Sequence, residues 1–179
     1  IMQTNIKRML AYSTVSHMGF ILLAFMAGSI GSTAGLYYAI TYALMAAAGF
    51  GILMVLSTDN IECEEIKDLA GLNQRHAWFA LLMLLVMFSM AGIPPLMGFY
   101  AKFGVIMVLL KFHYVWLSVF AVVMSLIGAF YYLRVVKVMY FDEPTHDQPI
   151  GSNYAAKFVL TVNAFLLLLW GIMPQTVID

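Results

Sequence analysis

The third apolar stretch of this sequence, residues 78–110, is too long for one straight membrane crossing and has two adjacent prolines near its middle. It covers about 33 residues, whereas a helix needs roughly 20 to cross a bilayer, and tilting does not absorb so large an excess. Pro94 and Pro95 remove two backbone N–H donors, and Gly92 and Gly98 loosen the flanks. The stretch therefore predicts a helix that is broken inside the membrane.

We expect a half-helix over about 78–91, a break at 92–98 and a second half-helix over about 98–110. Non-helical backbone at membrane depth is tolerated only where protein or a wet cavity satisfies its polar groups. Broken spans of this kind are where transporters place their ion sites. The break is therefore the most informative feature of the chain.

The composition is typical of a membrane protein. Hydrophobic residues make up 63% of the 179 and charged residues only 10%, whereas soluble domains carry about 25% charge. The net charge of zero, with basic residues at helix ends, argues against a nucleic-acid partner. The sequence predicts an all-α polytopic membrane protein with five transmembrane helices, the third discontinuous. The other four spans are expected at about 5–28, 34–57, 114–140 and 155–173.

The chain begins with Ile1, and its first apolar stretch starts almost at once. Lys7 and Arg8 before that stretch, with small residues at 27–29, resemble a secretory signal peptide. Four further spans follow, so we expect residues 1–179 to be part of one longer transmembrane domain.

The basic residues predict the orientation of the chain in the membrane. Five crossings place the N-terminus and the two long loops, 58–77 and 141–154, on one face and the C-terminus on the other. Seven basic residues fall on the first face and Lys111 alone on the second, so the first face is predicted to be cytoplasmic and the C-terminus periplasmic. The seven are Lys7, Arg8, Lys67, Arg75, Arg134, Lys137 and Lys157.

Lys102 belongs to neither face. It is expected about one turn into the second half-helix and about 12 Å from its outer end, where a lysine costs roughly 2.5–3.5 kcal/mol. Burial and the positive end of that half-helix disfavour the ammonium, whereas carbonyls freed by the prolines favour it. A lysine between such opposed effects can take up and release a proton, so we predict that Lys102 carries protons on an ion path. The alternative is a lysine that snorkels to the outer interface.

His17 lies near the middle of the first span. It follows Ser13 by four residues and Thr14 by three, so both hydroxyls share its helical face. Histidine titrates near physiological pH, and ionisable groups inside membranes are usually functional. We predict that His17 belongs to the proton relay, with water linking it to Lys102. The alternative is a neutral histidine bonded to a neighbouring helix.

Other polar residues of the spans favour supporting roles. Mid-membrane polar groups of this kind are usually interhelical contacts, and they are Thr41, Tyr42 and Asn163. Tyr42 is also predicted to support the relay, together with Ser13 and Thr14. An aromatic and basic belt at the cytoplasmic interface is expected from Tyr131, Tyr132, Arg134 and Lys137.

The sequence offers no site for a cofactor. It has no ATP-binding loop, dinucleotide fingerprint, metal-ligand spacing or nucleophile elbow. Its one cysteine, Cys63, excludes an internal disulfide or a cysteine-based metal site. We therefore expect no cofactor, no metal and no redox active site in this chain.

Three segments resemble the antiporter-like, proton-translocating membrane subunits of respiratory complex I. They are Gln3–Gly19, Ala91–Phe103 and Tyr131–Pro144. In order, they are similar to the tenth helix, the broken twelfth helix and the end of the thirteenth helix of those subunits. The resemblance covers essentially the whole chain and is closest to the branch of the family that has lysine, not glutamate, on the broken helix.

The resemblance implies that the chain is helices ten to fourteen of a fourteen-helix, multi-pass subunit in the bacterial inner membrane. Such a subunit translocates protons as part of an NADH–quinone oxidoreductase, coupled to quinone reduction elsewhere. Lys102 would end the family's central axis of charged residues, and His17 matches the histidine of the tenth helix. A glutamate and two lysines would lie upstream. The implied partners are other membrane-arm subunits and lipid, with FMN, iron–sulfur clusters and quinone in other subunits.

Two other interpretations remain open. A subunit of a multi-subunit cation/proton antiporter shares the fold and a lysine on the broken helix, but the Tyr131–Pro144 segment favours the respiratory subunit. A structural scaffold without an ion path explains Lys102 and His17 poorly, because apolar residues would serve it better.

Overall fold

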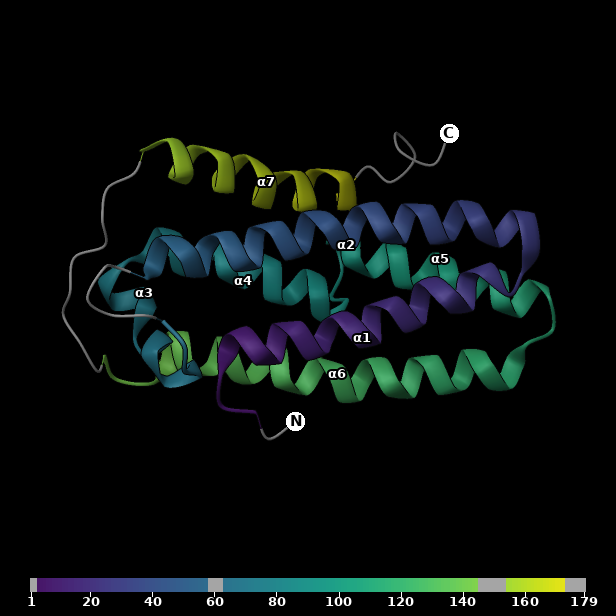
Figure 1. The fold of residues 1–179 in the computed structure, drawn as a ribbon, viewed down its shortest axis with the longest axis horizontal. Coiled ribbons are helices and arrows are strands. Elements are labelled where there is room, and N and C mark those ends of the chain that lie inside the picture. Colours follow the sequence, from purple (N-terminus) through teal and green to yellow (C-terminus); the bar gives the residue numbers. More distant parts are fainter. Residues whose placement is uncertain (1–2, 58–62, 145–153, 173–179) are drawn as a thin grey trace.

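A computed structural model describes residues 3–57, 63–144 and 154–172, and the regular elements in this part of the chain are all helices (Figure 1). Three of them, α2, α6 and α7, are each long and apolar enough to cross a membrane alone, and α4 is a shorter apolar helix. The elements are α1 (Ile6–Phe25), α2 (Gly28–Leu56), the 3-10 helix η1 (Ile66–Leu69), α3 (Leu72–Arg75), α4 (Ala77–Ala91), α5 (Met97–Lys111), α6 (Val115–Phe141) and α7 (Tyr154–Ile172).

The long helices lie side by side along the longest axis of the molecule, and α4 and α5 follow one another along that axis (Figure 1). Helix α4 is central, because it packs against α2, α5, α6 and α7. Its side chains Leu82, Met83, Val86 and Met87 are fully buried. The outer surface carries many large apolar side chains, such as Leu22, which suits a chain surrounded by lipid or by other membrane helices.

The connection between the first two helices differs from the prediction. Gly28 was expected to end the first span, with the second beginning near residue 34, but α1 ends at Phe25 and α2 already begins at Gly28. The helices can turn so tightly because Gly31 lies against α1. A Cβ atom at Gly31 would overlap the carbonyl oxygen of Ala24.

Helix α4 ends at Ala91, where the backbone turns into a left-handed conformation. Gly92 has a φ of 85°, which glycine adopts without steric cost. Its N–H donates to the carbonyls of Phe88 and Ser89, each at 3.0 Å, and thereby closes the last turn of the helix.

The start of α5 is packed against the end of α4. The N–H of Gly98 donates to the Ser89 hydroxyl at 3.1 Å, which satisfies one of the unpaired donors of the first turn of α5. The contact requires glycine, because a Cβ atom at Gly98 would overlap the Ser89 carbonyl oxygen.

The predicted half-helices, 78–91 and 98–110, match the bounds of α4 and α5 to within one residue at each end.

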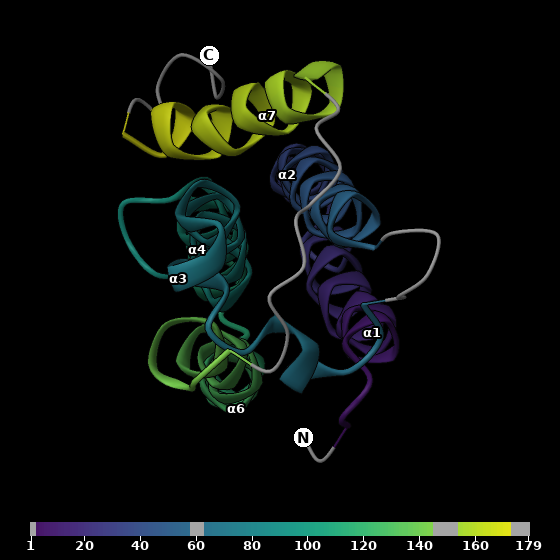
Figure 2. The ribbon, with the colours of Figure 1, turned by 90° about the vertical axis from the view of Figure 1, so that its left-hand side faces the viewer.

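Helix α7 lies obliquely across α2 and α4, as Figure 2 shows. The Asn163 side chain donates to the carbonyl of Leu44 on α2 at 3.2 Å, so Asn163 forms the interhelical contact expected of it. Thr41 instead donates to the Tyr37 carbonyl of its own helix. Near the C-terminal end of α7, Gly171 approaches the break so closely that a Cβ atom at this residue would overlap the Pro95 carbonyl oxygen.

A short polar segment, residues 63–71, covers one end of the bundle. Ile6 N–H donates to the Glu64 carbonyl at 2.7 Å, and Ile66 N–H donates to the Thr4 carbonyl at 2.8 Å. At its other end, Gly71 N–H donates to the carbonyl of Val138 on α6 at 3.2 Å. The segment thus links the start of α1 to the end of α6, and we call it the clasp.

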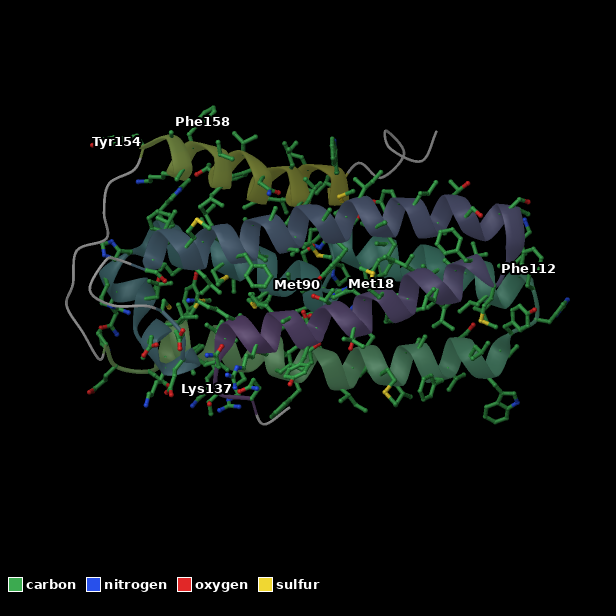
Figure 3. The ribbon with its side chains drawn as sticks, viewed as in Figure 1. Met18, Met90, Phe112, Lys137, Tyr154 and Phe158 are labelled. Carbon is green, nitrogen blue, oxygen red and sulfur yellow. The ribbon has the colours of Figure 1, made fainter. Side chains whose placement is uncertain are left out.

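Basic residues gather at the same end as the clasp. In Figure 3, Lys137 and Tyr154 lie at this end and Phe112 at the opposite end. The described parts of the two long connections, residues 63–77 and 141–144, also lie at this end of the bundle (Figure 1).

Candidate functional site

Lys102 lies in the second turn of α5 and is only 8% exposed. Side chains of a helix point toward its N-terminus, so the lysine reaches back to the end of α4. Its Nζ donates to the carbonyls of Met90 at 2.9 Å and Ala91 at 3.0 Å, and to the Ser125 hydroxyl of α6 at 2.9 Å. All three hydrogens of the ammonium therefore have an acceptor.

The two carbonyls are those that the prolines leave without a donor. In a continuous helix the N–H groups of residues 94 and 95 would donate to the carbonyls of residues 90 and 91, but Pro94 and Pro95 have no N–H. A buried carbonyl without a donor costs roughly 1–3 kcal/mol. The lysine thus supplies the two missing hydrogen bonds, and the carbonyls replace part of the water that the ammonium lost.

The helix end nearest to the ammonium is the C-terminal end of α4. The prediction weighed the positive N-terminal end of α5, which disfavours a cation, against carbonyls freed by the prolines, which favour one. Nζ contacts those carbonyls, at the negative end of α4. The Phe20 ring, 5.7 Å from Nζ, also favours the cation.

His17 is 3% exposed and lies between two tyrosines of other helices. Its Nδ1 is 2.8 Å from the hydroxyl of Tyr38 on α2, and its Nε2 is 3.1 Å from the hydroxyl of Tyr132 on α6. The imidazole also stacks on Tyr42, with 4.6 Å between ring centroids. The histidine is thus bonded to neighbouring helices on both sides, and both ring nitrogens face groups that can donate or accept.

The predicted supporting groups lie beside His17 but do not bond its ring nitrogens. Ser13 and Thr14 both donate to the Leu10 carbonyl of their own helix, and the Tyr42 hydroxyl donates to Thr14 Oγ1 at 2.6 Å. None of these hydrogen bonds involves the imidazole nitrogens. Ser13 and Thr14 share the face of His17, as expected, but its hydrogen-bond partners are Tyr38 and Tyr132.

The predicted aromatic belt is wrong for Tyr132. This residue is 2% exposed and bonded to His17, whereas an interface residue would be open to lipid headgroups. The reason is that Tyr132 lies more than two turns before the helix end at Phe141, on the face of α6 that packs against His17. Lys137, by contrast, is exposed and lies at the end of the bundle (Figure 3).

A groove of about 800 Å³ between α1 and α6 joins the two ionisable residues. Lys102, His17 and Ser125 all line it, together with Phe20 and Tyr132. Phe20 contacts Lys102 on one side and stacks on Tyr38 at 5.5 Å on the other. Figure 3 places Met90, next to the end of α4, and Met18, the neighbour of His17, midway between the two ends of the bundle.

The described residues hold no group of three or more His, Cys, Asp or Glu side chains that could bind a metal ion. Cys63 lies outside the spans, where burial raises the pKa of its thiol to about 11. The thiol is therefore protonated at neutral pH and is a poor ligand or nucleophile.

Sequence reasoning missed Tyr38, Ser125 and the structural role of Ser89. Tyr38 had a usable signal, since it lies four residues before Tyr42 and so on the same face of α2. Ser125 and Ser89 had none, because only the packing of α4, α5 and α6 brings their hydroxyls to the break.

The family model described as NADH:quinone oxidoreductase/Mrp antiporter, TM, matches residues 1–128. The chain is 81% identical over 180 aligned residues to NADH-quinone oxidoreductase subunit N of Neisseria gonorrhoeae and 59% identical to the subunit of that name from Laribacter hongkongensis. The two alignments include 100% and 98% of this chain, respectively. The chain spans only 37% of the length of each relative.

Solved structures show the same arrangement of helices. A chain of respiratory complex I from Thermus thermophilus with bound aureothin superimposes with a TM-score of 0.88 at 28% identity, over 99% of this chain and 40% of that one. A chain of the Mrp complex from Dietzia sp. superimposes with a TM-score of 0.86 at 22% identity, over 99% of this chain and 41% of that one. The second likeness concerns the fold alone.

Proposed function

The chain belongs to the transmembrane family of NADH:quinone oxidoreductase and Mrp antiporter subunits, and from this premise we propose that it carries protons within the membrane arm of a bacterial NADH–quinone oxidoreductase. One observation carries the proposal. A lysine buried at a helix break donates all three of its hydrogens to neighbouring groups, and it shares a groove with a buried histidine. A scaffold gains nothing from two ionisable groups inside the membrane.

In this proposal Lys102 and His17 are the proton-carrying groups. Water in the groove between α1 and α6 links them, since the Phe20 ring contacts both Lys102 and Tyr38 and offers no polar atom. The break at Gly92, Pro94, Pro95 and Gly98 supplies the carbonyls that make an ammonium tolerable at this depth. The face of α1 on which His17 lies is stabilised by hydrogen bonds of Ser13, Thr14 and Tyr42.

The topology that fits this function has five crossings. Helices α1, α2, α6 and α7 each cross once, and α4 with α5 makes the third, discontinuous crossing. The clasp end is cytoplasmic, because the basic residues gather there, and the C-terminus is periplasmic. The five crossings are part of one longer transmembrane domain in the bacterial inner membrane.

The partners are the other membrane-arm subunits, with upstream helices and lipid covering the apolar outer surface. Redox chemistry, with FMN, iron–sulfur clusters and quinone, belongs to other subunits. A multi-subunit cation/proton antiporter is the second candidate, and the fold shared with the Dietzia Mrp complex supports it. The 81% identity to an oxidoreductase subunit favours the first.

The test is Lys102→Ala in the full-length subunit, assembled in its complete complex and reconstituted into liposomes. We expect NADH-driven proton uptake to fall about tenfold or more, while the complex still assembles. Lys111→Ala, at the exposed end of the same helix, is the matched control and should leave uptake unchanged. Normal uptake in the Lys102 variant would exclude the proposed role. Uptake that requires Na⁺ or K⁺ rather than NADH would favour the antiporter.

A further inference from the structure

The three groups around Lys102 are not chemically equivalent. The Met90 and Ala91 carbonyls can only accept a hydrogen bond, whereas the Ser125 hydroxyl can also donate one. A charged lysine offers three hydrogens, and all three partners accept. A neutral lysine offers two hydrogens and one lone pair, and its lone pair needs a donor.

Ser125 is the one partner that can serve both states of the lysine. After loss of a proton, the two carbonyls can keep the two remaining N–H groups, and the hydroxyl can turn to donate to the nitrogen lone pair. The carbonyls are also fixed by α4 and buried, because Met90 and Ala91 are 2% and 5% exposed. The proton that Lys102 can lose is therefore the one directed at Ser125.

Ser125 also differs in its access to the groove. Its residue is half-buried, on the α6 wall of the groove between α1 and α6, whereas Met90 and Ala91 are not part of that lining. A water molecule in the groove can thus reach the hydroxyl of Ser125, which lines the groove together with Lys102.

We propose that Lys102 exchanges its proton with water in the groove through the hydroxyl of Ser125, an inference that rests on the proposed proton-carrying role of Lys102. In the step, the Lys102 N–H bond directed at Ser125 breaks as a new O–H bond forms at Ser125 Oγ. The original Ser125 O–H bond breaks at the same time, and its proton passes to a groove water to give hydronium. Uptake is the reverse of this step.

The proposal is tested with three substitutions at Ser125 in the full-length subunit of the assembled complex. Ser125→Ala removes the hydroxyl, and Ser125→Val removes it while adding bulk. Ser125→Thr has nearly the same shape as the valine variant but keeps the hydroxyl. We expect NADH-driven proton uptake to fall about tenfold in the alanine and valine variants and to be largely retained with threonine.

Two further variants control the experiment. Ser118→Ala alters another serine of α6, whose hydroxyl donates to the Tyr114 carbonyl of its own chain segment, and should leave uptake normal. Lys102→Ala is measured in parallel. Normal uptake in Ser125→Ala, or equal loss in the valine and threonine variants, overturns the role of Ser125 provided that Lys102→Ala has lost uptake. If Lys102→Ala itself retains uptake, the proposed function fails as well.

Discussion

The imidazole of His17 faces a tyrosine hydroxyl at each nitrogen, which gives it two equivalent ways to be satisfied while neutral. In one tautomer Tyr38 accepts from Nδ1–H and Tyr132 donates to Nε2, and in the other the roles are exchanged. Switching between them moves a proton from one side of the ring to the other. In the proposed relay, the two tyrosines therefore determine how readily a proton crosses the imidazole ring.

Replacing Tyr38 with phenylalanine should slow the relay without removing the histidine. We expect Tyr38→Phe to lower NADH-driven proton uptake about tenfold, because Nδ1 loses its partner while the ring stack on Phe20 remains. Tyr114→Phe, an exposed tyrosine before α6, is the control. Equal uptake by the two variants would show that the Tyr38 hydroxyl has no part in transfer.

At this scale the sequence predicted which ionisable groups are buried, but not which groups contact them. Lys102 and His17 were identifiable because ionisable residues are costly at their depth. Their partners Ser125 and Tyr132 both lie on α6. Ser125 follows Lys102 by more than twenty residues, and Tyr132 follows His17 by more than a hundred. No local spacing reports such contacts, since they depend on how the helices pack.

Among the elements, the prolines and the lysine form one unit. In the double variant Pro94→Ala, Pro95→Ala, restored N–H groups compete with Lys102 for the Met90 and Ala91 carbonyls. We expect the helix to extend past Ala91 and proton uptake to fall about tenfold. The measurement is NADH-driven uptake by the assembled complex. An unchanged rate would mean that the lysine does not depend on these carbonyls.

The close packing of α5 against α4 predicts a difference between two glycines of the same helix. A Cβ atom at Gly98 would overlap the Ser89 carbonyl oxygen, whereas at Gly104 it would meet nothing within 4 Å. Gly98→Ala should destabilise the protein by about 1–3 kcal/mol and lower the yield and Tm of the complex. Gly104→Ala should leave both unchanged. The reverse order would contradict the packing at the break.

The broken stretch was the best-predicted element, because proline has the same effect on any helix. The bounds of α4 and α5 lie within a residue of expectation. The turn between α1 and α2 was predicted wrongly, because residues 29–33 were expected to separate the two spans. Gly31 instead allows two helices to touch, and a single sequence does not distinguish these uses of glycine.

For the whole molecule, the distribution of charge predicts which end faces the cytoplasm. His113 is exposed in the connection before α6, and Glu143 is exposed beyond its other end. In a full-length subunit without other reactive cysteines, Glu143→Cys should react with a membrane-impermeant maleimide only in inverted vesicles. His113→Cys should react only in spheroplasts. Labelling of both from the same side would contradict five crossings with this orientation.

The family was predictable from the sequence because three separated motifs occur in the correct order. The match over residues 1–128 and the relatives named subunit N confirm that resemblance. The all-helical fold followed from composition alone. The groove did not, since it is a gap between α1 and α6 that no single segment encodes.

The clasp has a mechanical consequence for the groove. Its hydrogen bonds join Ile6, at the start of one wall, to Val138, near the end of the other, through a segment only nine residues long. The two helices that form the groove, α1 and α6, are thus linked by a part of the chain that lies outside the apolar spans. A neighbouring subunit that moved this segment would therefore change the spacing of α1 and α6, and with it the width of the groove, without touching either ionisable residue.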